Sequence, residues 1–355
     1  MDFALSEEQQ ELASTVRSLL AKRSDGPAVR KAIESDRGFD TELWSVLCEQ
    51  VGAAALSVPE KHGGAGFTSF ETHVVLEELG AALTPSPLLG SGVLATQALL
   101  LSGDESACSE LLPGIAAGTT IASLVWDWSG DAQPVTADGS SLIGTCEQVL
   151  DGDVADVLLV VTGDGLFRLD PGLSGVRRIH VGSMDQTLRF ATVDLDGADA
   201  TRIGSGTDWL PTLRDVACVA VTALQVGAMQ RCLDLTVTYS KEREQFGRPI
   251  GSFQALKHRM ADMLVDVETS RSVSWAAAWS AALHDEHLAE RAALAKAWCS
   301  DALSRVAGET VQLHGGIAIT WEHDVQLYFK RAHALAQLFG QPHVHRSRLQ
   351  ETWLP

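Results

Sequence analysis

Two separate stretches of the chain combine residue types that bind phosphate groups. The first, residues 243–254, opens with Arg243, and the second, residues 312–316, ends in the pair Gly315–Gly316. A guanidinium offers a planar fork of N–H donors to phosphate oxygens. Adjacent glycines let backbone N–H groups approach an anion closely. The two stretches therefore indicate an anionic ligand, although an arginine that caps a helix and glycines that end one give the same pattern.

The elements that position these residues follow from hydrophobic spacing, which changes twice along the chain. Residues 1–118 show helical spacing, and Ser6 fits the N-cap of a capping box with Gln9. Residues 119–206 contain short apolar runs separated by Gly and Asp, which predict a small antiparallel sheet or barrel. Residues 207–355 contain long helical patterns with short links, which predict a helix bundle.

The predicted bounds are approximate. Helices are expected over residues 6–22, 40–51, 70–83, 92–101 and 105–117, and strands over 157–161, 166–169, 176–181 and 190–195. The segment 59–66, rich in glycine, is expected to be a loop. In the last zone Thr207 or Asp208 caps a helix to about Lys241 and Ser252 caps one to about Leu283. A third helix is expected from about residue 285 to 313, followed by two shorter ones.

Composition limits the classes of protein. The 355 residues are 45% hydrophobic and 21% charged, as in an ordinary soluble globular protein, and suffice for two or three packed units. A formal net charge of −19 disfavours nucleic acid and anionic membranes as partners. The six cysteines form no CxxC pair, so we expect core thiols rather than a metal site or disulfides.

The location expected for the protein is the cytoplasm. The first residues are acidic and lack the apolar segment of a signal peptide. We also expect no apolar run long enough to span a bilayer. His343 and His345 have an x-His-x-His spacing, but no cysteine or acid pair accompanies them, so we expect no metal site.

Three blocks of sequence resemble the acyl-CoA dehydrogenase family and follow one another in that family's order. The first is N-terminal, the second contains residues 243–263, and the third begins at residue 312. The residues that carry the resemblance are Trp44, Gly52, Pro59–Glu60, 63–66, Glu71 and 77–80 in the first block; 243–254, Lys257–His258 and 260–263 in the second; and 312–317, Thr320 and Tyr328 in the third.

The resemblance implies a fold and an activity. The fold is of the α+β class: an N-terminal helical domain (1–118), a middle domain with a small β-sheet or barrel (119–206), and a C-terminal four-helix bundle (207–355). Members of the family bind FAD noncovalently and remove two hydrogens from the α and β carbons of an acyl-CoA. Their subunits form dimers or tetramers in which a neighbour helps to hold the FAD. The implied electron acceptor is an electron-transfer flavoprotein.

The resemblance also assigns cofactor contacts. Arg243 corresponds to a residue near the FAD pyrophosphate, and Phe246 to one beside the adenine. Residues 312–316 correspond to the backbone cradle of the ADP part. The full set of implied cofactor-binding residues is Arg243, Gln245, Phe246, Phe253, Gln254, Gln312, Leu313, His314, Gly315 and Gly316.

The chain departs from the family where the catalytic base is expected. Many members carry a glutamate near the C-terminus, and here Phe339 occupies that place, although a phenyl ring cannot accept a proton. Other members carry it on the long helix before Arg243, where the matching position is near Ala217. Asp215 lies close to that position and is the candidate base. The alternative is that it is a solvated aspartate in the first turns of a helix.

The family's arginine beside that second position is also missing, because Cys218 stands there. In the middle zone the family's usual Thr-Glu-Pro-rich loop is replaced by a segment containing Trp126 and Trp128. Either tryptophan could cover the flavin ring, and burial in the sheet explains them equally well.

These departures leave three functions open. The first is a subunit of a heteromeric acyl-CoA dehydrogenase, as in some actinobacterial relatives that act on steroid-derived CoA thioesters, with a partner supplying the base. The second is a homomeric enzyme with a relocated base, Asp215. The third is a non-catalytic binding or assembly subunit on the same scaffold.

Overall fold

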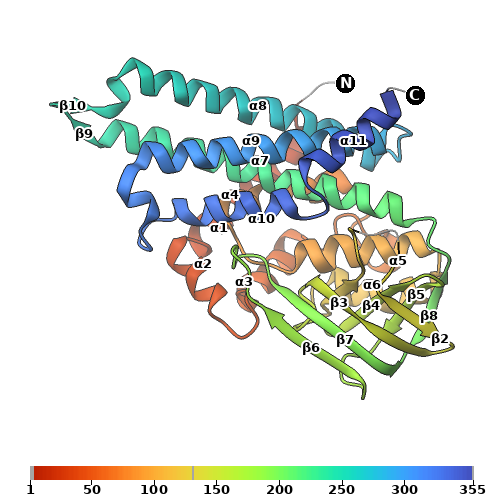
Figure 1. Cartoon of the computed structure of the whole chain (residues 1–355). Coiled ribbons are helices and arrows are strands. Elements are labelled where there is room, and N and C mark those ends of the chain that lie inside the picture. Colours follow the sequence, from red (N-terminus) through yellow and green to blue (C-terminus); the bar gives the residue numbers. More distant parts are fainter. Residues whose placement is uncertain (1–3, 130–131, 354–355) are drawn as a thin grey trace. The chain divides into compact units, whose positions relative to one another are not determined.

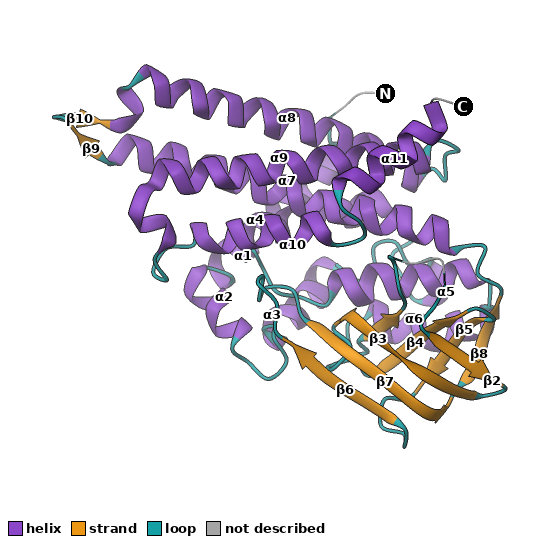
Figure 2. Cartoon of the chain, in the orientation of Figure 1, coloured by secondary structure: helices purple, strands orange, loops and turns teal. Residues whose placement is uncertain are grey.

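The computed structural model of the chain describes residues 4–129 and 132–353 (Figures 1 and 2). Helices come first: α1 (Glu7–Arg23), α2 (Gly26–Ile33), α3 (Thr41–Val46), α4 (Ser69–Ala82), α5 (Thr96–Ser102) and α6 (Glu105–Ala116), with the π segments η1 (Leu47–Val51) and η3 (Leu88–Ala95) and the 3-10 turn η2 (Glu60–His62). Strands follow: β1 (Ala122–Val125), β2 (Val135–Asp138), β3 (Ser141–Leu150), β4 (Val157–Thr162), β5 (Gly165–Leu169), β6 (Val176–Val181), β7 (Phe190–Asp199) and β8 (Thr201–Ser205).

The remaining elements are again mostly helical. They are α7 (Leu210–Glu242), the short strands β9 (Glu244–Gln245) and β10 (Arg248–Pro249), η4 (Ile250–Ser252), α8 (Gln254–Ala282), α9 (Leu288–His314), η5 (Gly315–Ile319), α10 (Val325–Gln337) and α11 (Pro342–Trp353). The predicted order of helices, strands and helices is therefore confirmed. The domain boundaries at residues 118 and 206 stay predictions.

The chain forms two compact units. The helical unit contains residues 1–28, 73–84 and 218–355, and the mixed unit contains residues 29–72 and 85–217. Each unit gathers segments that lie far apart in the sequence.

Local capping explains where several helices begin. Ser6 and Gln9 form the predicted capping box: the Ser6 hydroxyl accepts from the Gln9 amide at 3.2 Å, and the Gln9 side chain accepts from the Ser6 amide at 3.0 Å. The prediction that Ser252 caps α8 is wrong, because Ser252 lies inside η4 and the extended Phe253 precedes the helix. Helix α9 also begins later than predicted, since Asp285 accepts from the His287 amide in a preceding turn.

The mixed unit contains two four-stranded sheets, in the orders β1-β4-β5-β8 and β2-β3-β7-β6. The expectation of purely antiparallel pairing is wrong for one pair, because β1 and β4 run parallel with Ala122 opposite Val157. The chain leaves β1 to build β2 and β3 in the other sheet and returns as β4. Leu142, Phe167 and Val193, from both sheets, lie in one buried core.

In the helical unit α7, α8 and α9 run side by side (Figure 2). By length and composition α7 could cross a membrane, so the expectation that no apolar stretch is long enough is wrong. However, 83% of its apolar window is buried inside the structure, as for the core helix of a bundle.

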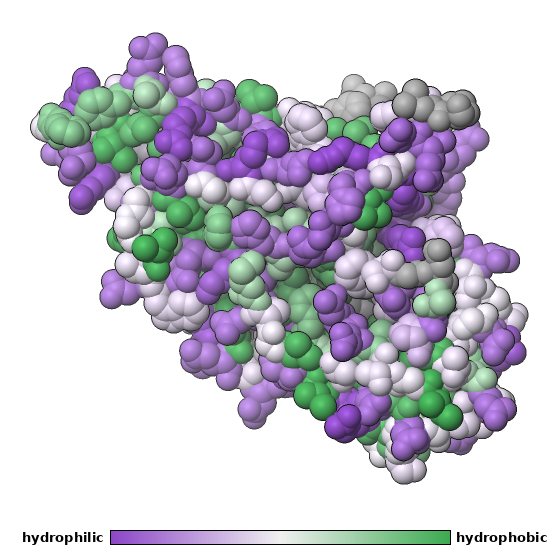
Figure 3. Space-filling model, in the orientation of Figure 1, coloured by the Kyte–Doolittle hydropathy of each residue, from purple (hydrophilic) through white to green (hydrophobic). Residues whose placement is uncertain are grey.

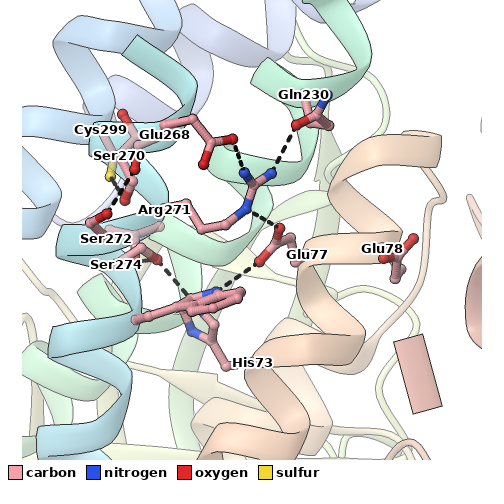
Figure 4. A network of polar contacts seen from close by, with 12 residues as sticks. His73, Glu77, Glu78, Gln230, Glu268, Ser270, Arg271, Ser272, Ser274 and Cys299 are labelled. Carbon is pink, nitrogen blue, oxygen red and sulfur yellow. Dashed lines mark hydrogen bonds and ion pairs between the residues drawn. The ribbon is translucent and has the colours of Figure 1, made fainter. Parts of the chain in front are cut away.

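Helix α4 joins this bundle through polar contacts (Figure 4). Arg271 of α8 donates to Glu77 of α4 at 3.3 Å and to Gln230 of α7 at 2.9 Å. The Trp275 indole donates to the other Glu77 oxygen at 3.1 Å. Burial raises the pKa of Glu77, and the nearby Arg271 partly opposes this. The network satisfies a carboxylate that would otherwise be costly to bury.

The backbones of α4 and α7 approach closely at two glycines. A Cβ on Gly227 of α7 would lie 1.8 Å from the Glu77 carbonyl oxygen, and a Cβ on Gly80 of α4 would lie 2.4 Å from that of Leu224. Only glycine permits this separation, so the crossing depends on both residues.

We predict that Gly227→Ala lowers the free energy of unfolding by about 1–3 kcal/mol or more, because the methyl group forces α4 and α7 apart. The matched control is Gly308→Ala in α9, where an added Cβ meets nothing within 4 Å. There the higher helix propensity of alanine should stabilise by up to about 1 kcal/mol. Chemical denaturation of both variants checks the signs, and equal effects would contradict the crossing argument.

Candidate functional site

The first phosphate-binding stretch forms a hairpin at the end of the bundle. After α7 ends at Glu242, strands β9 and β10 pair with Gln245 opposite Arg248. The turn between them has positive φ at both Phe246 (53°) and Gly247 (75°), as a type I′ hairpin turn requires. This hairpin was not predicted from the sequence, although a glycine at position 247 was an available signal for a tight turn.

Most of the predicted cofactor residues in this stretch are exposed. Arg243, Gln245 and Gln254 face solvent, and the Phe246 ring is 91% exposed. No hydrogen bond or ion pair joins the Arg243 side chain to another residue of the described chain. Phe253 is less exposed, and the Cζ atom of Arg248 lies over its ring, 4.0 Å from the ring centroid. The hairpin thus presents cations and an aromatic ring to a ligand.

The second stretch follows the end of α9 at His314. Gly315 has φ 65° and ψ −145°, a conformation that glycine adopts and other residues avoid. A Cβ on Gly315 or Gly316 would meet nothing within 4 Å, so the backbone here borders open space. Gln312 is exposed, whereas the side chains of Leu313 and His314 are buried. These two buried residues anchor the turn and can reach a ligand only through their backbone.

The fold brings the two stretches to the same end of the helical unit. The Tyr239 ring in the last turn of α7 stacks on His314 with a centroid separation of 4.5 Å. The Arg243 carbonyl accepts from the Ile250 amide at 2.8 Å, which holds the base of the hairpin. The exposed cation, open glycine backbone and aromatic ring fit a pyrophosphate with an attached base, as in the ADP part of FAD.

The place of the expected base is a closed structural loop between α10 and α11. Phe339 is 2% exposed with φ 59°, and its carbonyl accepts from His345 Nε2 at 3.1 Å and from Cys218 Sγ at 3.8 Å. Burial lowers the pKa of His345 to about 4, so this imidazole is neutral at pH 7. No carboxylate takes part in this loop within the described residues.

A buried lysine secures the same loop. Lys296 of α9 is fully buried and donates to the carbonyls of Leu335 at 3.0 Å, Ala336 at 3.3 Å and Gly340 at 3.1 Å. Burial lowers the pKa of Lys296 to about 8. The amine satisfies carbonyls at the end of α10 that have no partner inside the helix.

The candidate base Asp215 lies in the second turn of α7, in the mixed unit. Its side chain is only 4% exposed, so the alternative of a solvated aspartate is wrong. The helix enters the core early, since Leu213 and Ala217 are both 0% exposed. A role for Asp215 as the base stays a prediction.

A second buried acid is Asp151. It was not predicted from the sequence, because an Asp-Gly pair after a strand indicates an exposed turn. Asp151 follows β3 with φ 56° and is 6% exposed. Burial raises its pKa to about 7; Asp153 adds to the rise and Arg189 opposes it. The carboxyl lines a cavity of about 10 Å³, room for about one water. A Cβ on Gly90 would lie 2.6 Å from Asp151 Oδ2, so the carboxyl needs a glycine opposite.

The remaining predictions concern the two tryptophans, the cysteines and metal binding. Trp126 is buried and Trp128 half-buried, and a flavin contact from either stays a prediction. All six cysteines are free and buried, which confirms that they are core thiols. Over residues 4–129 and 132–353, no cluster of three His, Cys, Asp or Glu side chains could hold a metal ion.

Two family models match the chain: "Acyl-CoA dehydrogenase, N-terminal domain" over residues 6–119 and "Acyl-CoA dehydrogenase, C-terminal domain" over residues 204–354. With the fold and the bundle-end site, these matches show that the chain belongs to the acyl-CoA dehydrogenase family, whose members are oxidoreductases that act on acyl-CoA. The resemblance seen in the sequence is thereby confirmed.

Three relatives are similar to this chain over nearly its whole length. The acyl-CoA dehydrogenase IpdE2 of Mycolicibacterium smegmatis is 46% identical over 349 residues, 98% of this chain and 99% of that protein. The crystal structure of the ChsE4-ChsE5 complex from Mycobacterium tuberculosis matches with a TM-score of 0.91 and 32% identity, over 100% of both chains. A variant of the Tcur3481-Tcur3483 steroid ACAD matches with a TM-score of 0.88 and 30% identity, over 97% of each chain.

We predict that Asp151 makes the protein less stable as the pH rises. Its folded pKa of about 7 lies above the ordinary 3.8, so between these values only the folded state keeps the proton. The free energy of unfolding should therefore fall by about 1.4 kcal/mol for each pH unit across that range. Asp151→Asn should match the wild type near pH 4 and exceed it at pH 7.5, as measured by denaturation at both pH values.

The control for this prediction is Asp153→Asn. Asp153 pairs with Arg189 at 2.5 Å, and both side chains are mostly buried. Its loss should destabilise the protein at pH 7.5 instead. If Asp151→Asn also destabilises there, Asp151 is charged in the folded state and the pH argument is wrong.

Proposed function

We propose that the chain is one subunit of a heteromeric, FAD-dependent acyl-CoA dehydrogenase. It holds the ADP part of FAD at the bundle end, and a partner subunit supplies the base that removes the α proton of the acyl-CoA. The observation that carries the proposal is Phe339: the place of the family's base holds a buried ring.

The loop around Phe339 supports this division of labour. Its carbonyls are engaged by His345 and Lys296, and both donors are buried. Turning the loop outward would break the bond from His345 to the Phe339 carbonyl and the bond from Lys296 to the Gly340 carbonyl, which costs free energy for each buried group. The loop is thus built to hold the chain in place, and a proton acceptor has to come from elsewhere.

The exposed apolar residues at the bundle end support a neighbouring subunit. Phe246 is 91%, Ile319 76% and Trp321 55% exposed. In Figure 3 apolar atoms lie among hydrophilic ones at the tip formed by β9 and β10. We take these exposed apolar side chains as the surface that the partner covers. A partner that covers them would also enclose a cofactor held between the hairpin and the glycine pair.

The relatives support the kind of partner and substrate. Two structural neighbours are named as pairs of chains, and one of them is named a steroid ACAD. We infer by analogy a partner of the same fold and a steroid-derived or other lipid acyl-CoA thioester as substrate. FAD as the cofactor, an electron-transfer flavoprotein as the acceptor and a cytoplasmic location belong to the same proposal.

One observation favours the homomeric alternative. Asp215 is buried rather than solvated, and carboxyls kept out of water are frequent at active sites. In that case the chain would carry its own base and need no unlike partner.

The first experiment counts FAD per chain from the visible absorbance of the purified protein. We expect little FAD on the chain alone, and about one FAD per two chains with acyl-CoA oxidation when a related subunit is co-expressed. One FAD per chain with activity alone would establish the homomeric enzyme. Stable association with a partner but no flavin reduction would indicate an assembly subunit.

The second experiment tests Asp215 directly. In the assembled enzyme we expect Asp215→Asn to keep acyl-CoA oxidation within about twofold of the wild type, because the partner supplies the base. Loss of a general base lowers the rate by about 10²–10⁴-fold. The matched control is Asp208→Asn, an exposed aspartate just before α7. A rate loss of that size for Asp215→Asn alone, with FAD still bound, would favour the homomeric alternative.

A further inference from the structure

Three aromatic rings, which we call the ring stack, contact one another at the bundle end. Tyr239, in the last turn of α7, lies 4.5 Å from the His314 ring at an interplanar angle of 22°. The His323 ring, just before α10, lies 5.0 Å from His314 on a tilted plane. The three rings come from the end of α7, the end of α9 and the segment before α10, so their contacts hold these three segments together.

Hydrogen bonds fix the orientation of the central ring. His314 Nδ1 lies 2.7 Å from the Thr310 carbonyl, which can only accept, so the proton is on Nδ1. Burial lowers the pKa of His314 and so disfavours its charged form. His323 Nδ1 accepts from the Val325 amide at 3.3 Å, which fixes that ring as well.

Tyr239 contacts both phosphate-binding stretches. Its carbonyl accepts from the Arg243 amide at 2.8 Å, and its ring packs on His314, the residue before Gly315. The turn η5 that carries the glycines is otherwise closed by local bonds, such as the Thr320 amide to the Ile317 carbonyl at 3.1 Å. The ring contact therefore helps to hold the glycine pair relative to Arg243, together with the hydrogen bond from Thr236 of α7 to Thr310 of α9 at 3.3 Å.

We propose that Tyr239 is a positioning residue for the dinucleotide: its ring, through His314, sets the spacing between Arg243 and the pair Gly315–Gly316. The inference rests on the proposed function, since it concerns the same site. A site whose donors are already placed binds more tightly, because less conformational freedom is lost on binding. The stack serves this purpose without touching the phosphates itself.

The test measures binding of ADP and of FAD to the assembled protein by titration calorimetry. A stacked ring pair contributes enough to change an equilibrium by about three- to tenfold. We expect Tyr239→Leu to weaken ADP binding by about that factor, and Tyr239→Phe, which keeps the ring, to bind as the wild type does. His323→Leu should give a smaller loss in the same direction.

The matched control is Phe329→Leu, which removes another ring–histidine pair, Phe329 with His333 at 4.5 Å within α10. It should leave ADP binding unchanged. Thermal unfolding of each unliganded variant separates positioning from general damage: a variant that melts earlier but binds ADP normally when folded overturns the inference. If Tyr239→Leu does not fold, the comparison of His323→Leu with Phe329→Leu decides, and equal affinities overturn it.

The outcomes also separate this inference from the proposed function. If the wild-type assembly binds neither ADP nor FAD, the proposed function fails first. If it binds both and Tyr239→Leu binds them equally well, only the role of the ring stack is wrong.

Discussion

The close crossing of α4 and α7 is the constraint on which the helical unit depends. At Gly80 and Gly227 the two backbones approach within a distance that no Cβ could share. Helix α7 thereby lies in the bundle core, and its last turn delivers Tyr239 and then Arg243 to the bundle end. The polar network of Glu77 and Arg271 secures α4 at the same crossing.

The polar groups of the helical unit have a structural role at one place and are open to a ligand at another. At the loop after α10, Lys296 and His345 satisfy carbonyls around Phe339, and this arrangement stabilises a turn rather than a reaction. At the bundle end, by contrast, Arg243 and the glycine pair remain open. The proposed function accordingly assigns cofactor binding to this end of the chain and proton transfer to a partner.

The mixed unit keeps two acids out of water at different places. Asp215 lies in the early turns of α7, and Asp151 lies after β3 beside a small cavity. Burial raises the pKa of Asp151, so its charged form is held in the folded protein only at a free-energy cost. Asp153 and Arg189 form an ion pair near Asp151; the charge of Asp153 adds to the rise of the Asp151 pKa and the charge of Arg189 opposes it.

The linear sequence was enough to predict the family, the order of helices and strands, the Ser6 capping box and the two phosphate-binding stretches. These depend on local spacing and on motifs that a linear chain displays. It could not determine that Asp215 is buried, that β1 pairs with β4 in parallel, or that Asp151 lies beside Gly90. Nor could it show that Tyr239 joins Arg243 to His314. These points follow from the folded chain, because burial, strand pairing and the pKa of a buried acid depend on residues that are distant in sequence.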